Sequence, residues 1–222
     1  MKRFLAAVVA VTTALALTAC GSSSTNTTTD DKSAESTDDT TYKIGVLQLT
    51  QHAALDKANE GFIAALDESG IKYEVDQQNA SGEQSACQTI AEKLVNDGND
   101  LIYAIATPAA QAVAGVTSEI PIVLSAVTDP AESGLVASND APGGNVTGTS
   151  DLTPVKEQIE LLKQILPDAK TVGILFCSSE SNSEIQAAMA REACEANGLE
   201  HIDFTVSSSN EIQTVVESMV GK

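Results

Sequence analysis

Residues 48–56, with the sequence QLTQHAALD, carry two amides, a hydroxyl, an imidazole and a carboxylate in one short stretch. His52 and Asp56 stand four residues apart, so on a helix they would share a face and could pair a base with an acid. A single His beside an Asp more often makes a local hydrogen bond. The chain also lacks the Gly-x-Ser-x-Gly turn of serine hydrolases and the Walker A sequence of phosphate-binding loops. We therefore expect a binding role and no enzyme activity.

Composition argues against several other kinds of site. The two His and four Cys show no paired spacing, so we expect no metal and no cofactor. Apart from Cys20, the cysteines Cys87, Cys177 and Cys194 are interpreted as small buried or half-buried thiols without a disulfide. The formal net charge of −19 argues against nucleic acid, whose binding needs clustered Lys and Arg.

The elements that must position residues 48–56 follow an alternating pattern. Short runs rich in Val, Ile and Leu predict strands, and longer amphipathic runs between them predict helices. The strands are expected at 42–49, 71–76, 100–106 and 121–127, and the helices at 53–69, 83–97 and 108–118. This β-α-β-α-β-α-β order is typical of α/β proteins with a doubly wound parallel sheet.

The remaining chain predicts a second, smaller unit. Residues 128–150 are rich in Gly and Pro and are expected to form a surface excursion that leads to a crossover between lobes. A helix should then begin at Thr153-Pro154, with Thr153 as N-cap, and end before Pro167. Strands at 171–176 and 201–206 and helices at 183–197 and 210–220 complete the pattern. Two strands make too small a sheet to stand alone, so we expect this second lobe to be incomplete and the chain to be part of a longer gene product.

The first 41 residues predict export and anchoring. Residues 1–19 have the basic start and short apolar run of a signal peptide. The sequence LTAC that ends at Cys20 resembles the bacterial lipobox, so we expect Cys20 to carry the lipid that holds the protein on the outer face of the cell membrane. Residues 20–41 are almost devoid of apolar side chains and predict a flexible tether. The predicted domains are therefore a first α/β lobe over 42–150 and a partial second lobe over 151–222.

The candidate binding loops follow the carboxyl ends of the predicted strands, where open α/β sheets bind their ligands. Ser, Thr, Asn and Gln dominate these loops, and charged side chains are few. Two of the loops lead directly into helices, at Thr107-Pro108 and at 178–183. Because the first backbone N–H groups of a helix are unpaired and carry a partial positive charge, such loops favour an anion such as a carboxylate.

Several segments resemble lipoprotein solute-binding proteins of ABC importers, of the tryptophan- and tyrosine-transport type. The matching segments are the lipobox, KIGVLQLTQHAALD from Lys43, TPAAQA from Thr107, PIVLSAVTDP from Pro121, PGGNVTGTSD from Pro142 and TVGILFCSSESNS from Thr171. The resemblance implies a periplasmic-binding-protein fold of type I, with two α/β lobes and a ligand held between them. It also implies an ABC permease and an ATPase as partners, and closure of the lobes around the solute without bond breaking.

The same resemblance implies ligand contacts in the loops described above. Those residues are Gln48, Thr50, Gln51, His52, Asp56, Thr107, Ala109, Gln111, Ser125, Thr128, Ser179, Ser181, Asn182 and Ser183. The expected solute is a small polar organic molecule, with an aromatic amino acid as one candidate. Two alternatives stay open at this point: a membrane-anchored sensor that reports occupancy to a signalling partner, and a cell-surface α/β enzyme, which the lack of a nucleophile–base pair disfavours.

Overall fold

The computed structural model describes residues 40–221. The predicted signal peptide, the lipidation of Cys20 and nearly all of the tether lie outside the described residues. Among the helices of residues 40–221, none combines the length and the apolar character that crossing a membrane requires.

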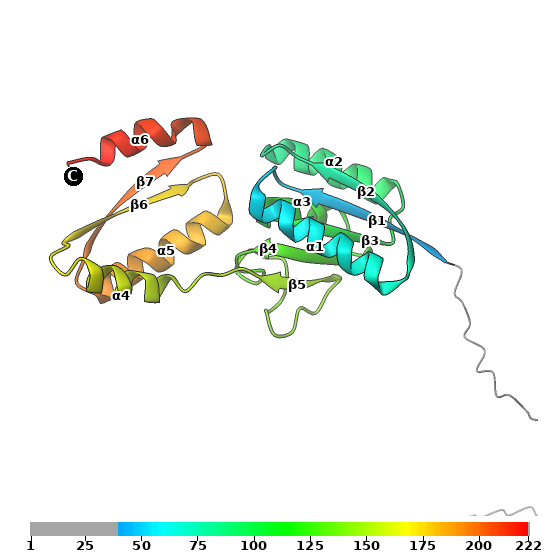
Figure 1. The fold of residues 1–222 in the computed structure, drawn as a ribbon, viewed down its shortest axis with the longest axis horizontal. Helices are drawn as coiled ribbons and strands as arrows, with labels where there is room; N and C mark the ends of the chain where they lie inside the picture. The colour runs from blue at the N-terminus through cyan, green and yellow to red at the C-terminus, as the bar shows by residue number, and fades with distance from the viewer. Residues whose placement is uncertain (1–39, 222) are drawn as a thin grey trace, which may run out of the picture. The chain divides into compact units, whose positions relative to one another are not determined.

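The first half of the described chain forms one parallel five-stranded sheet (Figure 1). Its strands lie in the order β2-β1-β3-β4-β5, which confirms the predicted α/β class. The strands are β1 (Thr41–Gln48), β2 (Lys72–Asn79), β3 (Leu101–Ile105), β4 (Ile122–Val127) and β5 (Val146–Ser150). The four strands predicted from the apolar runs are thus confirmed, with small shifts at their ends.

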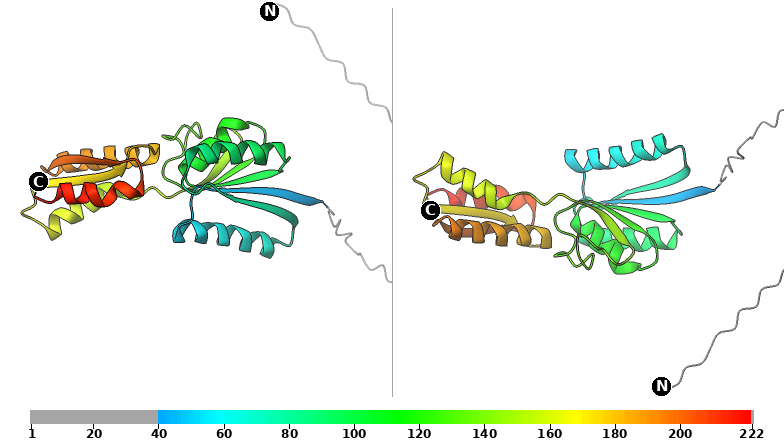
Figure 2. Two further views of the ribbon diagram at one scale, coloured as in Figure 1. Left: turned by 90° about the horizontal axis from the view of Figure 1, so that it is seen from above. Right: turned by 90° about the horizontal axis from the view of Figure 1, so that it is seen from below.

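Helices cover both faces of this sheet. Helix α1 (Ala53–Ser69) lies on one face, and α2 (Gln84–Asn96) and α3 (Thr107–Val116) lie on the other (Figure 2). The face under α2 and α3 holds the larger core, with fully buried residues such as Leu94, Ile102 and Val113. On the opposite face Tyr103 stacks on Phe62 of α1, with ring centroids 4.0 Å apart. Because β3 is buried on both faces, its sequence LIYAI is apolar throughout.

The strand β5 corrects the sequence prediction, which assigned 128–150 to a surface excursion without a strand. Its sequence VTGTS contains a Gly and has a single buried residue, Val146, so it lacks the apolar run that marked the other strands. It forms the outer edge of the sheet and pairs with β4 across a register shift between Leu124 and Val127. A Cβ at Gly148 would fall on the backbone of Leu124, so this close approach requires Gly.

The second half of the described chain forms a separate two-stranded parallel sheet, as predicted. It consists of β6 (Thr171–Cys177) and β7 (Glu200–Val206). Its helices are α4 (Val155–Ile165), α5 (Ser181–Ala196) and α6 (Ile212–Met219), the last preceded by a 3₁₀ turn at Ser209–Glu211. The predicted cap of α4 is wrong by one residue: Pro154 is the N-cap, and the Thr153 hydroxyl instead hydrogen-bonds Gln186 Oε1 at 2.9 Å.

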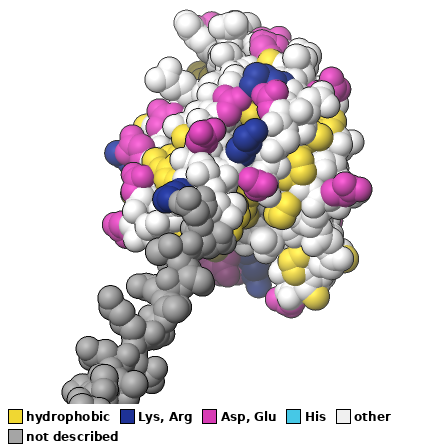
Figure 3. Space-filling view, turned by 90° about the vertical axis from the view of Figure 1, so that its right-hand side faces the viewer, with side chains coloured by type: hydrophobic (Ala, Val, Ile, Leu, Met, Phe, Trp, Pro, Cys, Tyr) yellow, Lys and Arg dark blue, Asp and Glu magenta, His cyan; other side chains and the backbone are white. Residues whose placement is uncertain are grey.

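The three described cysteines are free thiols. Cys87 and Cys194 are buried and Cys177 is half-buried, in agreement with the sequence interpretation. Burial raises the pKa of the Cys87 thiol to about 11. On the face drawn in Figure 3, the Lys and Arg side chains are dispersed among acidic ones and form no continuous basic surface.

Candidate functional site

Three loops begin side by side at the carboxyl edge of the five-stranded sheet. The backbone N–H of Leu49 donates to Ile105 O at 3.2 Å, which joins the ends of β1 and β3. The N–H groups of Ala80 and Gly82 donate to Gln48 O and Leu49 O at 2.9 and 2.8 Å, which joins the ends of β2 and β1. This is the edge at which open α/β sheets bind ligands.

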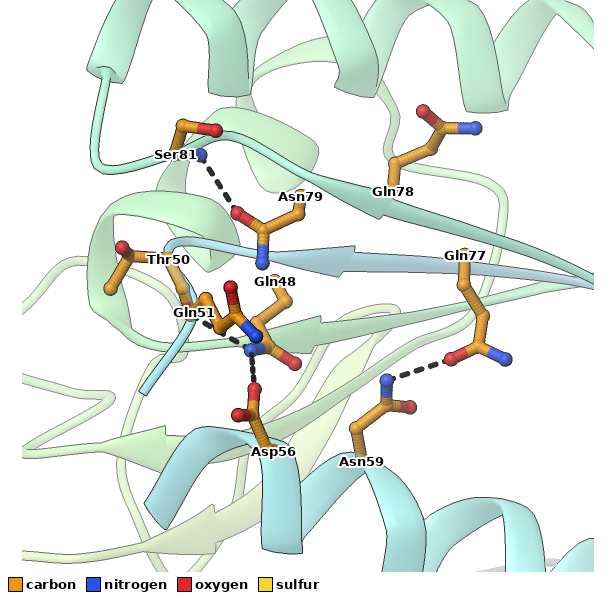
Figure 4. A pocket seen from close by; sticks show the side chains of 9 residues that line it. All are labelled: Gln48, Thr50, Gln51, Asp56, Asn59, Gln77, Gln78, Asn79 and Ser81. Atoms are coloured by element: carbon orange, nitrogen blue, oxygen red, sulfur yellow. Dashed lines mark hydrogen bonds between the residues drawn. The ribbon is translucent and has the colours of Figure 1, made fainter. Parts of the chain in front are cut away.

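A polar cavity of about 640 Å³ opens beside these loops (Figure 4). The sequence prediction supplied four of the residues that line it: Gln48, Thr50, Gln51 and Asp56. Five further lining residues were not among the predicted contacts: Asn59, Gln77, Gln78, Asn79 and Ser81. The last four belong to 77–81, one of the candidate loops at the strand ends. The run of amides at 77–79 was a visible signal, but its place beside α1 depends on the pairing of β1 with β2.

Gln48 is the most buried side chain of the cavity wall, with 4% of its surface exposed. Its amide nitrogen donates to Thr50 O at 2.8 Å and to Asp56 Oδ1 at 2.7 Å. A buried amide needs such partners, and these two fix its orientation. Gln48 therefore ties the loop after β1 to the first turns of α1 and holds the Asp56 carboxylate at the cavity (Figure 4).

Two more hydrogen bonds order the wall of the cavity. Asn59 Nδ2 of α1 donates to Gln77 Oε1 of β2 at 2.8 Å, and the N–H of Ser81 donates to Asn79 Oδ1 at 2.8 Å. Asn59 Oδ1 is buried and has no hydrogen-bond partner within residues 40–221. The wall thus contains one acceptor that a bound molecule could satisfy.

His52 does not line this cavity and does not pair with Asp56. It is the N-cap of α1, and its Nδ1 accepts a hydrogen bond from the N–H of Ala54 at 3.2 Å. The ring nitrogen is thus the hydrogen-bond acceptor of the N-cap, a role that a Ser or Asp side-chain oxygen usually has. The sequence interpretation preferred a local hydrogen bond to an acid–base pair; the bond observed is local, but it joins His52 to the Ala54 backbone and not to Asp56.

Three residues other than Gly have positive φ in the described chain, and all belong to this edge of the sheet. They are Ser81 at 55°, Ala106 at 82° and Ala126 at 54°. Ser81 and Ala106 follow β2 and β3, and Ala126 lies near the end of β4 in the irregular pairing with β5. Such conformations are unfavourable for L-residues by about 1–3 kcal/mol each and gather at functional sites. Backbone strain therefore marks the same edge that the loops and the cavity mark.

The N-terminus of α3 lies at this edge, directly after the strained Ala106. The helix begins at Thr107 with no side-chain cap, and Pro108 occupies its first turn. Thr107 is 1% exposed, and its hydroxyl Oγ1 has no hydrogen-bond partner among the described residues. Ala109 is fully buried in the core, so its side chain packs against protein. The helix start and the Thr107 hydroxyl together offer several hydrogen-bond donors to an anion.

The predicted residues of the fourth strand do not line the cavity. Ser125 lies within β4. Burial raises the pKa of the Tyr103 phenol, and the Ser125 side chain opposes the rise. Thr128 is buried, and its carbonyl accepts a hydrogen bond from Ser150 Oγ at 2.6 Å.

The predicted residues at the start of α5 form a separate polar group. Gln111 of α3 donates from Nε2 to Ser181 Oγ at 3.1 Å and to Ser133 O at 3.1 Å. Ser179 contacts Cys177 Sγ through its hydroxyl at 3.1 Å. The neighbouring Asn182 Oδ1 is buried without a partner in the described chain. Gln111 and Ser181 are thus brought together, whereas neither these residues nor Ser183 lines the polar cavity.

No cluster of three or more His, Cys, Asp or Glu within residues 40–221 is arranged to hold a metal ion. The chemistry available at the carboxyl edge is therefore hydrogen bonding by amides and hydroxyls, one carboxylate and one helix N-terminus.

Comparison with known proteins identifies relatives of this chain. The family model described as ABC transporter substrate binding protein matches residues 43–222. A tyrosine-binding protein of Clostridioides difficile is 44% identical over 193 residues, which are 85% of this chain and 56% of that protein. A crystal structure from Streptococcus pneumonia, described as an ABC domain in complex with L-Trp, is 42% identical with a TM-score of 0.78, and the match covers 82% of this chain and 63% of that one.

A more distant structure agrees in fold. The leucine-binding protein LivK of Thermotoga maritima has 17% identity and a TM-score of 0.63, over 80% of this chain and 53% of that one. The chain spans less than two thirds of the length of each of these relatives. The predicted resemblance is confirmed: this chain belongs to the family of ABC transporter substrate-binding proteins.

Proposed function

We propose that the protein captures a small zwitterionic solute, an amino acid, and presents it to the permease of an ABC importer. The observation that carries this proposal is the buried, unpartnered hydroxyl of Thr107 at the start of α3. Thr107 does not line the polar cavity, but it follows β3 at the same carboxyl edge of the sheet. A buried hydroxyl without a partner is costly in the free protein, and a bound molecule that completes its hydrogen bond would recover that cost.

The carboxylate of the solute binds at the start of α3. The backbone N–H groups of the first helical turn, the positive end of the helix dipole and the Thr107 hydroxyl all favour an anion there. No Lys or Arg is needed, which agrees with the polar, uncharged loops of this edge. The positive φ of Ala106 directs the chain from β3 into the helix at this point.

An aromatic amino acid is the first solute to test. The C. difficile relative is named a tyrosine-binding protein, and the S. pneumonia structure contains L-Trp. The cavity volume of about 640 Å³ leaves room for a side chain of that size. Its amide-rich wall further favours a side chain with a polar group.

The remaining parts of the proposal concern the whole protein. Residues 42–150 and 151–222 belong to two lobes that close around the solute, and the chemistry is binding without catalysis. Lipidation of Cys20 after removal of 1–19 anchors the protein outside the cell membrane, with residues 20–41 as the tether. The partners are an ABC permease and its ATPase.

A thermal-shift screen of the full-length protein against the common amino acids tests the proposal. A solute at 100 times its dissociation constant stabilises the folded state by about 2.7 kcal/mol. For a protein of this size, that stabilisation raises the unfolding midpoint by several degrees. Sugars and dicarboxylic acids serve as negative controls. A shift with sugars and none with any amino acid would refute the proposed solute class.

A further inference from the structure

We propose that Asp56 and Asn59, on one face of α1, form the receptor for the protonated amine of the solute. This inference rests on the proposed function and extends it from the carboxylate to the other end of the same molecule. It also makes a distinction that the proposed function alone does not make, between amino acids and simple carboxylic acids.

The charge of the cavity selects for a cation or a hydrogen-bond donor. Asp56 is the one charged residue among the nine that line it, and the other eight carry amides or hydroxyls. Within residues 40–221 no Lys, Arg or His nitrogen lies within ion-pair distance of Asp56. The adjacent Lys57 pairs with Glu60 instead. The Asp56 carboxylate is therefore available as a counter-ion.

The hydrogen bonds of Asp56 leave one of its oxygens for a ligand. Oδ1 accepts from the Gln48 amide at 2.7 Å, and no protein donor reaches Oδ2 in the described chain. Since Gln48 is nearly fully buried and is itself held by Thr50 O, the carboxylate is fixed before a ligand arrives. A pre-oriented carboxylate binds an ammonium group without first losing side-chain freedom.

Asn59 supplies a second acceptor on the same helix face. It follows Asp56 by three residues, so both side chains project from one side of α1 into the cavity (Figure 4). Its Nδ2 is committed to Gln77, whereas its Oδ1 is buried and unpartnered. An ammonium group carries three N–H donors, which suits one free carboxylate oxygen and one free amide oxygen.

The proposal places the amine and the carboxylate of one solute at the same edge of the sheet. The ends of β1 and β3 are hydrogen-bonded neighbours through Leu49 and Ile105, so the loops that lead into α1 and α3 start side by side. Because both groups of an α-amino acid are bonded to one carbon, the proposal requires the solute to lie between these two loops.

Asp56 also has a plausible structural role, because it lies in the first turn of α1 and favours the helix dipole. The two roles predict different results. A structural role affects stability alone, whereas an amine receptor affects the ratio of affinities for a solute with and without its amine.

Calorimetric titration of the full-length protein with a matched pair of solutes tests the inference. The pair is L-tyrosine and 3-(4-hydroxyphenyl)propionate, which lacks only the amine, and L-tryptophan and its deaminated analogue form a second pair. We expect the wild-type protein to bind each amino acid about 10- to 100-fold more tightly than its deaminated partner, as expected for hydrogen bonds to a charged group. In Asp56→Asn the ratio should fall to within about threefold of one.

Glu68→Gln is the matched control variant. It removes one carboxylate from the same helix, but Glu68 is exposed and lies outside the cavity. It should therefore keep the wild-type ratio. Asn59→Ala should reduce the ratio less than Asp56→Asn, because the acceptor that it removes is uncharged. A thermal melt of each variant shows whether it is folded.

The outcomes separate the two proposals. An Asp56→Asn protein that is folded and keeps the wild-type ratio overturns the amine receptor and leaves amino-acid capture intact. Equal wild-type affinity for both members of each pair overturns it too. If no amino acid and no deaminated analogue binds, the proposed function and the inference both fail.

Discussion

Replacement of Thr107 by Val should raise stability and lower solute affinity. The Thr107 hydroxyl is buried and unpartnered, and an unsatisfied buried polar group destabilises the folded state by about 1–3 kcal/mol. Val keeps the branched shape of Thr, and the N-cap of α3 is Ala106, so no capping hydrogen bond is lost. We expect the unfolding free energy to rise by about 1 kcal/mol, which raises the midpoint by ~2–4 °C.

The same substitution removes a donor from the proposed carboxylate site. A hydrogen bond to a charged group contributes about 1.5–3 kcal/mol, so L-tyrosine should bind roughly 10- to 100-fold more weakly. Thermal unfolding followed by circular dichroism measures the first effect, and calorimetric titration measures the second. Opposite signs for stability and affinity are the signature of a group reserved for a ligand.

Thr117→Val is the matched control at the other end of α3. The Thr117 hydroxyl accepts hydrogen bonds from the N–H groups of Glu119 and Ile120, each at 3.2 Å. Its loss should lower stability by about 0.5–1.5 kcal/mol and leave solute affinity unchanged. If Thr107→Val instead lowers stability and leaves affinity unchanged, its hydroxyl has a structural partner and the reasoning is refuted.

Three further predictions concern parts of the fold outside the site. Cys87 should resist alkylation at pH 8, because a pKa of about 11 leaves only ~0.1% thiolate, and peptide mapping should show the half-buried Cys177 modified first. Gly148→Ala should lower the unfolding midpoint because its Cβ meets the backbone of β4, whereas Gly144→Ala, which meets nothing within 4 Å, should not; equal midpoints would contradict the close approach. The pKa of Asp129 is lowered because a side-chain amide and backbone N–H groups donate to it, so its contribution to stability is present above the unfolded pKa of about 4 and is lost as the pH falls through the lower folded pKa. Between about pH 5 and pH 2 the unfolding free energy should therefore fall more steeply for the wild type than for Asp129→Asn; parallel curves would disprove this.

The sequence predicted the elements that a simple pattern reveals. Apolar runs located β1 to β4, β6 and β7, and amphipathic runs located the helices. The strand β5 was not predicted, because an edge strand with one buried residue lacks an apolar run. The N-cap of α4 was misplaced by one residue, a usual margin at helix ends.

The candidate site was only partly predictable. The cavity residues Gln48, Thr50, Gln51 and Asp56 lie at or just after the end of β1, so the rule on strand ends found their loop, and the family resemblance selected the residues. Asn59 lies inside the predicted helix 53–69, and only the packing of α1 against the sheet brings it to Gln77 and the cavity. Gln77 directly follows the strand predicted at 71–76. The positive φ of Ala106 and Ala126 leaves no trace in the sequence, because Ala is not the residue expected in that region of φ.

A crystal structure of the full-length protein with bound L-tyrosine tests the central claim most directly. The account predicts the solute at the carboxyl edge of the five-stranded sheet, with its carboxylate within hydrogen-bond distance of Thr107 Oγ1 at the start of α3. A bound solute elsewhere, with the Thr107 hydroxyl still buried and unpartnered, would contradict it.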